Sequence, residues 1–346
     1  MTTTNSAQHP DSSSSRRYVL ASRPQGWPDE STFRLEETRL PDLADGEVRV
    51  ANEFLSVDPY MRGRMVEADS YVPPFVVDEP LTGGAVGSVI ASRAPDLPVG
   101  TRVLHQQGWR DLAQGRAEEF SSVRDDVPAS LSLHLLGMTG LTAYTGLVAA
   151  AGLREGDTVF VSGAAGAVGT AAGQFARLLG AKRVIGSAGS DQKVALLREE
   201  YGYDAAVNYR ERPIREQLPE VAPEGIDVYF DNVGGDHLEA ALDVMNRGGR
   251  AALCGAISGY NAQRPAPGPD NLTRLITFSL TLHGFTVGDY AREYRAEFAD
   301  RAGAWLAAGD LVYDETFRDG LEATPAAFLE MMRGGNIGKM LVRLTH

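Results

Sequence analysis

A glycine-rich turn at residues 163–169 restricts most strongly how this chain can fold. It follows an apolar run at 158–162, which is typical of a buried strand, and precedes apolar residues at helical spacing. Ala164 replaces the first glycine of the usual G-x-G-x-x-G pattern. In this setting backbone amides at the start of the helix can hold a pyrophosphate. We therefore predict a dinucleotide site that uses Gly166, Ala167, Val168, Gly169 and Thr170.

Strand-like and helix-like segments alternate after residue 128. Apolar runs at 183–186, 226–230 and 250–254 are separated by segments of helical periodicity, and the last run closes the series. This alternation predicts a doubly wound parallel sheet with helices on both faces. Before residue 124, short strands bounded by Gly and Pro indicate a barrel or a sandwich. The predicted fold class is α/β, with two domains in 346 residues.

The composition excludes several classes of function. A net charge of −13 repels phosphates, so no nucleic-acid partner is expected. No segment has the roughly 20 apolar residues that cross a bilayer, so no membrane association is expected. The polar segment 1–15 lacks the apolar core of an export signal, and we expect it to be a disordered tail of a cytoplasmic protein. Cys254 is the single cysteine, so neither a disulfide nor a multi-cysteine zinc site is expected.

The residues after the second strand-like run indicate which dinucleotide binds. NAD enzymes usually place a carboxylate there, which binds the ribose hydroxyls. This chain has Gly189 and Ser190 at that point, and Lys193 follows in the first helical turn. A cation and hydroxyl groups suit a 2′-phosphate. The alternative is that Lys193 is simply a solvent-exposed lysine of the helix. We expect Asp191 to cap the helix, and the pattern favours NADPH over NADH.

Seven motifs connect the chain to a known family. They are LSVDPYMRGRM (55–65), GMTGLTAY (137–144), the glycine turn, AGSDQK (188–193), FDNVGG (230–235), CGAISGYN (254–261) and GGNIGK (334–339). Their content and order resemble the zinc-independent medium-chain dehydrogenases/reductases. Within that family the resemblance is to the branch of prostaglandin reductases, leukotriene B4 12-hydroxydehydrogenase and curcumin reductases. It covers nearly the whole chain after Tyr18.

The resemblance implies a GroES-like β-barrel catalytic domain at 16–138 and a Rossmann NADPH-binding domain at 139–308. The segment 309–346 is implied to return to the catalytic domain, and the protein is implied to be a homodimer. In this family the residue that matches Lys193 meets the 2′-phosphate, and Tyr209 lies at the same end of the cofactor. Other matched positions line the ribose and nicotinamide: Asn232, Cys254, Gly255, Ala256, Ile257, Ser258, Phe285, Val287 and Asn336.

Two observations argue against a metal site. Zinc alcohol dehydrogenases of the same architecture use a cysteine in the strand region that this chain fills with residues 56–59, and none of these is a cysteine. The histidines after the first strand-like segments are scattered singly. We expect each of them to be structural or on the surface: His105, His134, His237 and His283.

Without a metal, reduction of a conjugated double bond is easier than reduction of a ketone. Hydride adds to the β-carbon, and the resulting enolate needs a stabilising donor and a proton. Tyr260, just after the last strand-like run, is the first candidate for the proton donor, because a phenol is neutral at pH 7. Tyr60 is the second candidate. For both, the alternative is a role in loop order or packing, with cofactor hydroxyls or water as the donor.

Three further polar residues have several interpretations. Cys254 is expected to allow close backbone approach to the cofactor and not to act as a nucleophile. Asp231 is expected to hold backbone amides and not to act as a base. Arg62 is expected either to pair with Asp58 or to meet a polar substrate tail. Loops at 71–76 and 260–265 are candidates for the lining of an open apolar pocket.

We expect an NADPH-dependent reductase of α,β-unsaturated ketones or aldehydes, acting on a small-molecule enone, alkenal or quinone. A zinc-free quinone reductase is an alternative with the same fold and cofactor, and the segments 59–62 and 334–336 favour the first reading. An NADPH-binding or sensing protein without catalysis is an alternative of another class. The retained Tyr260 argues against it.

Overall fold

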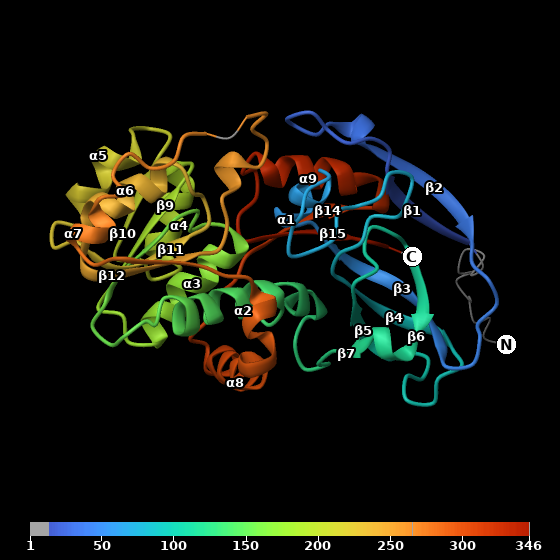
Figure 1. The fold of residues 1–346 in the computed structure, drawn as a ribbon. Helices are drawn as coiled ribbons and strands as arrows, with labels where there is room; N and C mark the ends of the chain where they lie inside the picture. Colours follow the sequence, from blue (N-terminus) through green and yellow to red (C-terminus); the bar gives the residue numbers. More distant parts are fainter. Residues whose placement is uncertain (1–13, 265, 346) are drawn as a thin grey trace.

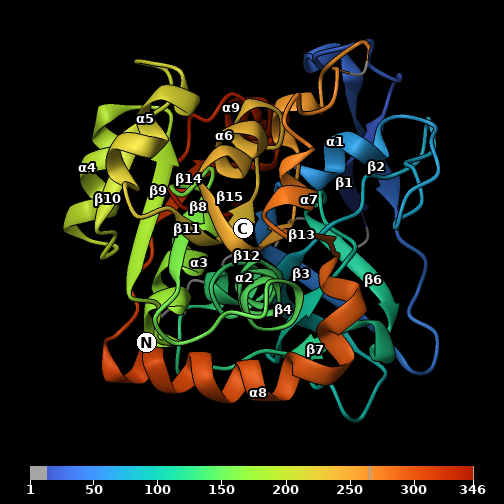
Figure 2. The same ribbon diagram turned by 60° about the vertical axis from the view of Figure 1, so that its left-hand side comes forward.

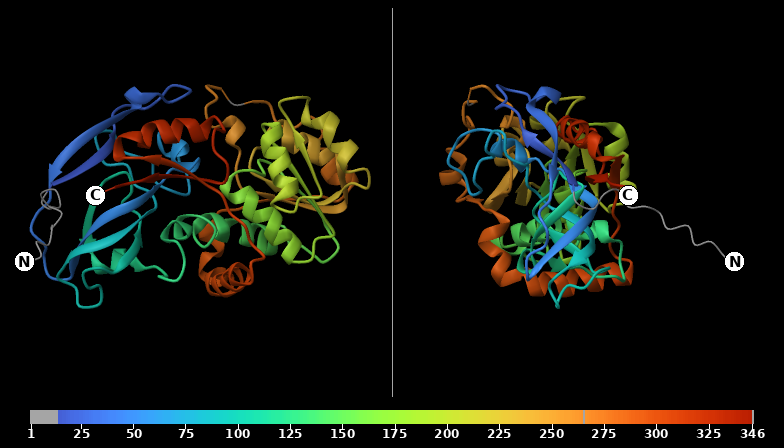
Figure 3. Two further views of the ribbon diagram at one scale, coloured as in Figure 1. Left: turned by 180° about the vertical axis from the view of Figure 1, so that it is seen from behind. Right: turned by 90° about the vertical axis from the view of Figure 1, so that its right-hand side faces the viewer.

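The computed structural model describes residues 14–264 and 266–345, so most of the predicted tail lies outside the described residues. Strand β1 (Ser14–Leu20) begins inside that predicted tail. Its first residue, Ser14, pairs with Arg39 of β2 (Phe33–Arg39). The prediction of a tail at 1–15 therefore extends two residues too far. Figure 1, and Figure 3 from behind, show two regions side by side, one built on a parallel sheet and one on antiparallel strands.

The first region contains a six-stranded parallel sheet (Figure 1). Its spatial order, β10-β9-β8-β11-β12-β13, is that of a Rossmann domain. The sequence patterns missed the two outer strands, because each has only four residues and no long apolar run. The run at 250–254 therefore does not close the series. The strands are Ala205–Asn208 (β10), Arg183–Ala188 (β9), Thr158–Val161 (β8), Ile226–Asp231 (β11), Met245–Leu253 (β12) and Thr281–Gly284 (β13).

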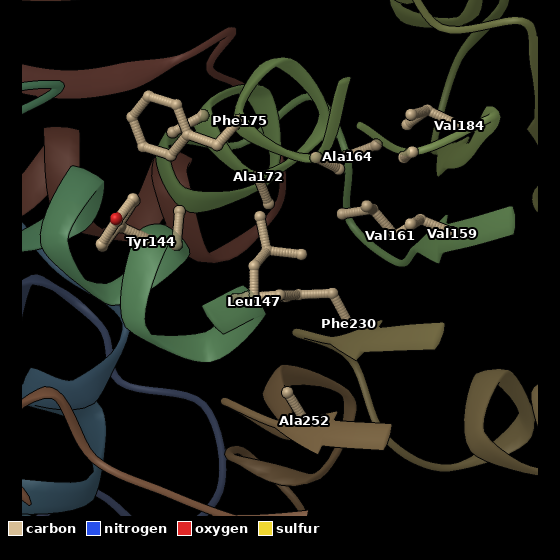
Figure 4. Packing of buried hydrophobic residues seen from close by; sticks show 14 of the residues in the cluster. Tyr144, Leu147, Val159, Val161, Ala164, Ala172, Phe175, Val184, Phe230 and Ala252 are labelled. Atoms are coloured by element: carbon tan, nitrogen blue, oxygen red, sulfur yellow. The ribbon is translucent and has the colours of Figure 1, made fainter. Parts of the chain in front are cut away.

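Helices cover both faces of this sheet, because successive side chains of a strand point to opposite faces. On β8, Val159 and Val161 enter the core under two helices, and Figure 4 shows Val161 close to Ala164 within this cluster. Phe160 enters the opposite core and stacks on Tyr229 of β11, with ring centroids 5.2 Å apart. The first face carries α2 (Met138–Thr145) and α3 (Ala167–Leu178), and the second carries α5 (Ile214–Val221) and α6 (Asp236–Val244).

A long helix, α8 (Val287–Ala308), lies along the outside of α2 and completes this side of the molecule (Figure 2). Shorter helices, α4 (Asp191–Glu199) and α7 (Arg274–Thr277), lie near the outer strands. Across residues 14–264 and 266–345, no helix combines the length and apolar character needed to cross a membrane.

The second region is built on β3 (Glu47–Ser56), which pairs along both of its edges. β4 (Ala85–Ser92) follows one edge. The other edge is shared by β6 (Leu112–Arg116) and by β15 (Lys339–Arg343), which comes from the end of the chain. The chain therefore returns to the sheet that its first part began. The sheet is completed by β5 (Arg102–His105), β7 (Ser121–Ser122) and β14 (Glu315–Asp319).

Two helices of the second region border the Rossmann region. α1 (Tyr60–Arg64) follows β3, and α9 (Thr324–Met332) packs Phe328 against Trp109 and Phe33 in the core of the antiparallel strands (Figure 1). The architecture is the GroES-like and Rossmann combination that the resemblance implies.

His105 is a buried part of the second region. Its Nδ1 accepts a hydrogen bond from the amide of Gln107 at 3.1 Å, so Nε2 carries the hydrogen and donates to Oδ1 of Asn52 at 2.7 Å. Burial, and then the charge of Arg110, lowers the pKa of His105 to about 3. The imidazole is therefore neutral in the folded protein and has a structural role.

This lowered pKa predicts a loss of stability in acid. The unfolded chain takes up a proton at His105 near its ordinary pKa of 6.5, whereas the folded protein does so only near pH 3. The free energy of unfolding then falls as the pH decreases through this window, by up to about 1.4 kcal/mol per pH unit. The variant His105→Gln should lose that part of the slope in urea denaturation series. Parallel slopes for the variant and the wild type would contradict the assignment.

Candidate active site

Five loops meet at one edge of the parallel sheet, because the carboxyl ends of parallel strands lie together. They follow β8, β9, β10, β11 and β12 in turn. These loops contain most of the residues that the sequence assigned to a cofactor: the turn at 163–169, residues 189–193, Tyr209, Asn232 and residues 254–260. The structure therefore brings together segments that are up to about 100 residues apart in the chain.

The glycine turn is shaped by Gly163 and Gly169. Gly163 has a φ of +59°, the left-handed conformation that favours glycine. This explains why the first glycine stands at 163, whereas Ala164 is a buried side chain. A Cβ on Gly169 would lie 2.5 Å from the carbonyl oxygen of Gly163, so the helix packs too closely for any other residue. Gly166 then stands at the N-cap of α3, with the amides of Ala167, Val168 and Thr170 in its first turn.

Lys193 and Arg210 converge at the end of β9 and β10. Lys193 Nζ donates to the carbonyl oxygen of Gly334 at 2.8 Å, and Arg210 donates to that of Arg333 at 3.2 Å. Burial, and then the charge of Arg210, lowers the pKa of Lys193. Neither cation has a carboxylate within ion-pair distance in the described part of the chain. Two neighbouring cations of this kind form a suitable site for an anion.

The surroundings of these cations also suit a phosphate. A Cβ on Gly189 would lie 2.8 Å from the Tyr209 hydroxyl and 3.2 Å from Arg210 Nε, so both groups lie close above this glycine. Arg210 is not among the residues predicted from the sequence, although its place directly after Tyr209 is a usable signal. The predicted cap of α4 by Asp191 is wrong, because the Ser190 hydroxyl accepts from the Lys193 amide at 3.3 Å and caps the helix. Asp191 instead accepts from Asn208 at 2.8 Å.

Asp231 orders the loop after β11. Its buried Oδ1 accepts hydrogen bonds from the hydroxyls of Tyr229 at 2.6 Å and Ser162 at 3.0 Å. The same oxygen accepts from the amides of Val233 at 2.9 Å and Gly234 at 2.8 Å. Asn232 Nδ2 then donates back to the carbonyl oxygen of Ser162 at 2.8 Å, which joins the ends of β8 and β11. Asp231 therefore holds backbone amides, as the sequence analysis expected.

The loop after β12 is fixed to the loop after β11. Ser258 Oγ donates to the carbonyl oxygen of Val233 at 2.6 Å, and the amide of Ile257 donates to that of Asn232 at 3.3 Å. The Tyr260 hydroxyl accepts from the amide of Ala256 at 3.3 Å, and burial raises its pKa. Since that amide occupies an oxygen lone pair, the hydroxyl hydrogen of Tyr260 remains able to donate to a ligand.

Tyr60 comes from the opposite region and lies against the same apolar cluster as Tyr260 and Ile257. Burial, and then the charge of Asp58, raises the pKa of the Tyr60 phenol, so it remains protonated at neutral pH. Tyr71 lies nearby with 66% of its surface exposed. Partial burial, followed by Tyr260 and Cys254, raises its pKa. Three neutral phenols therefore lie near one another, and the sequence singled out Tyr71 only as part of the loop at 71–76.

Three other residues singled out in the sequence are held mainly by protein contacts. Arg62 does not pair with Asp58. It donates to Oδ1 of Asn261 at 2.8 Å and to the carbonyl oxygen of Gly26 at 2.6 Å, so it joins three loops. The ring of Phe285 packs in the core against Phe230, which leaves only its backbone for a ligand. Val287, the first residue of α8, also contacts that core.

Asn336 lies in the C-terminal segment that crosses the site. It is buried, and its Nδ2 donates to the carbonyl oxygen of Gly338 at 2.7 Å. The amide of Gly338 donates to the carbonyl oxygen of Ala165 at 2.9 Å, so this segment touches the glycine turn. Asn336 therefore lies close to the predicted cofactor site, as the motif at 334–339 implies.

Comparison with known proteins places this geometry in a family. Residues 16–123 match the family model of the N-terminal domain of oxidoreductases, and residues 167–305 match that of zinc-binding dehydrogenases. The chain is 38% identical to the NADPH-dependent curcumin reductase of Escherichia coli (strain K12), over 95% of this chain and 96% of the relative. It is 42% identical to prostaglandin reductase 1 of Bos taurus, over 92% and 95%.

The chain belongs to the medium-chain dehydrogenases/reductases, in the branch of the prostaglandin and curcumin reductases. It is also 39% identical to an NADP(+)-dependent 2-alkenal reductase of Nicotiana tabacum, over 96% of this chain and 98% of the relative. Among solved structures, CurA from Vibrio vulnificus in complex with NADPH superimposes with a TM-score of 0.91. That structure is 39% identical, and the match covers 96% of this chain and 99% of the other.

One family model is named for zinc, but the residues of this chain do not fit a zinc site. In the strand region where zinc relatives carry a cysteine ligand, this chain has Ser56 and Asp58, and Asp58 is already bonded to Lys339 at 2.8 Å. Within residues 14–264 and 266–345, no three His, Cys, Asp or Glu side chains form a group that could hold a metal ion.

Cys254 is predicted to be chemically inert in the folded protein. Burial, and then the charge of Asp231, raises the pKa of its thiol to about 12, so almost no thiolate exists at neutral pH. Iodoacetamide at about pH 8 should alkylate the native protein roughly 10²-fold more slowly than the denatured chain. Because Cys254 is the single cysteine, alkylated thiol measures the reaction of this residue alone. Equal rates in the two states would show that the thiolate is accessible.

Proposed function

We propose that the protein is an NADPH-dependent reductase of the carbon–carbon double bond in α,β-unsaturated ketones and aldehydes, and that it works without zinc. The observation that carries this proposal is that Tyr260 and Tyr60, two neutral phenols from the two regions, pack against one apolar cluster beside the loops of the sheet edge. The relatives named for NADPH-dependent curcumin reduction and for 2-alkenal reduction support it.

The residues of the sheet edge fit NADPH. No side chain caps the start of α3, so the amides of the turn at 163–169 can bind the pyrophosphate. The 2′-phosphate suits the residues at the ends of β9 and β10: Ser190, Lys193, Tyr209 and Arg210. Because Gly189 has no side chain, the Tyr209 hydroxyl and the Arg210 guanidinium can lie close to the end of β9. We assign the nicotinamide end to loops that the structure holds together: Asn232, Cys254, Gly255, Ala256, Ile257, Ser258, Phe285 through its backbone, Val287 and Asn336.

Bound NADPH supplies a hydride for the β-carbon of the substrate. The chain then has to stabilise the enolate oxygen and deliver one proton. Tyr60 donates a hydrogen bond to the carbonyl oxygen of the substrate. Tyr260 transfers its phenolic proton to the α-carbon, as the enolate returns to the carbonyl form. The raised pKa values of both phenols keep these hydrogens in place until negative charge develops on the substrate. The amide of Ala256 then stabilises the phenolate of Tyr260 until solvent returns a proton to it.

A substrate screen tests this function directly. Purified protein should oxidise NADPH with 2-alkenals and enones, at equal rates with and without a metal chelator. Loss of activity with the chelator would contradict the zinc-free mechanism. Turnover with quinones alone would favour the quinone reductase, and tight NADPH binding without any acceptor would indicate a binding or sensing protein.

The 2′-phosphate assignment is tested by Lys193→Ala. Because a hydrogen bond to a charged group contributes about 1.5–3 kcal/mol, the Kd for NADPH should rise roughly 10- to 100-fold. The Kd for NADH should stay nearly unchanged. Arg210→Ala should likewise raise the Kd for NADPH relative to the Kd for NADH. The matched control is Lys182→Ala, a mostly exposed lysine before β9. Binding is followed by nucleotide fluorescence, and equal losses for the two nucleotides would refute the assignment.

Tyr260→Phe should lower kcat by about 10²-fold, because it removes the general acid and retains the ring. The Kd for NADPH should change little. The control is Tyr71→Phe, which removes a hydroxyl from the exposed rim of the same space. Single-turnover rates separate hydride transfer from product release. An unchanged rate for Tyr260→Phe would exclude this residue as the proton donor.

We also propose a homodimer in the cytoplasm. The outer strand β13 pairs only with β12 among the described strands, and the nearby Ile276 has 83% of its surface exposed. An open strand edge and an exposed apolar side chain suit contact with a second copy. The single cysteine suits a reducing compartment. Sedimentation velocity distinguishes the dimer from a monomer.

A further inference from the structure

The segment 334–339 touches both regions of the molecule through two adjacent residues. Gly338 bonds to the glycine turn through Ala165 and forms a bridge with Gly166. Lys339 points the other way, and its Nζ donates to Asp58 Oδ1 at 2.8 Å and to the carbonyl oxygen of Val57 at 2.9 Å. One short piece of chain therefore contacts the cofactor turn and the loop that leads into Tyr60.

The pair of Lys339 and Asp58 is almost completely buried, with 2% and 5% of the side chains exposed. The Ser56 hydroxyl donates to the second oxygen of Asp58. Buried ion pairs add little net stability compared with apolar side chains of the same size, because both charges lose their hydration. Stability alone therefore gives no strong reason for an ion pair here, whereas the directions of its hydrogen bonds specify one arrangement.

Asp58 also determines where Tyr60 stands. The carbonyl oxygen of Asp58 accepts from the amide of Met61 at 3.1 Å, and this bond starts α1, of which Tyr60 is the first residue. The side chain of Asp58 is bonded to Lys339, so the start of α1 is attached to the first residue of β15.

The segment itself has little freedom to shift. Gly338 has a φ of +60°, and a Cβ at this position would lie 1.9 Å from the carbonyl oxygen of Asp314. The amide of Lys339 donates to that same carbonyl at 3.1 Å, and Asn336 holds the carbonyl oxygen of Gly338. Because the segment is rigid, the position of one of its ends determines the position of the other.

We propose that Lys339 and Asp58 are positioning residues whose ion pair sets the distance between Tyr60 and the glycine turn. The proposal rests on the reductase function described above. The hydride donor is held by the Rossmann region and the Tyr60 hydroxyl by the antiparallel region, so their spacing needs a rigid connection. A displacement of about 1 Å between reacting groups lowers a rate by roughly 10²-fold.

The test removes both charges together in the double variant Lys339→Met/Asp58→Asn. Either single change would leave an unpaired buried charge and can unfold the protein, whereas the double variant leaves none. Single-turnover reduction of a medium-chain 2-alkenal is measured in the wild-type and Tyr60→Phe backgrounds. We expect a loss of about 10- to 100-fold in the wild-type background and less than about 2-fold in Tyr60→Phe. The Kd for NADPH should stay within about 2-fold, because Gly338 keeps its bond to Ala165.

The matched control is Arg343→Met/Asp319→Asn, which removes an exposed ion pair at the other end of β15 and should leave the rate unchanged. An unchanged rate in the buried double variant would overturn the proposal. So would equal losses in the two backgrounds, or a Tyr60→Phe variant as fast as the wild type. A wild-type protein that reduces no enone contradicts the reductase function itself, and the positioning role then falls with it.

Discussion

The buried carboxylate of Asp231 is the interaction on which the rest of the site depends. A buried charge is tolerated only with several donors around it, and one oxygen of Asp231 receives four. Those donors come from the ends of two neighbouring strands, so the carboxylate holds both ends in one arrangement. The loop that carries Tyr260 is bonded in turn to the loop that Asp231 orders. A single side chain thus orders the loops after β8 and β11.

The second constraint is the return of the chain end. β15 pairs with β3 of the antiparallel region, while the residue before it bonds to the glycine turn of the Rossmann region. The two regions are therefore joined by a segment that is short and rigid. Tyr60 and Tyr260, one from each region, pack against the same apolar cluster. Lys193 donates to the carbonyl oxygen of Gly334, the first residue of this segment, and Arg210 donates to that of Arg333, the residue before it. In the proposed function, cofactor binding and substrate placement therefore both depend on this part of the chain.

Much of the fold and part of the site could be predicted from the sequence. The alternation of strands and helices indicated the parallel sheet, because buried strands carry continuous apolar runs. It missed β10 and β13, whose four residues carry no such run. The role of Asp231 was predicted correctly, whereas the cap of α4 was assigned to Asp191 instead of Ser190. A hydroxyl and a carboxylate can both accept a hydrogen bond from a helix amide, and the sequence does not show at which of two adjacent residues the helix begins.

The sequence by itself determined the parallel-sheet region, the place of the glycine turn and the absence of a cysteine cluster, because these depend on local periodicity and composition. It also predicted which residues lie in the loops after the strands. Only the tertiary structure decided that Lys339, and not Arg62, pairs with Asp58, and that Arg210 stands beside Lys193. The first pair joins residues 281 positions apart in the chain, and the second brings together the ends of two neighbouring strands. Local patterns carry no information about which charges meet, because burial and strand pairing make that choice.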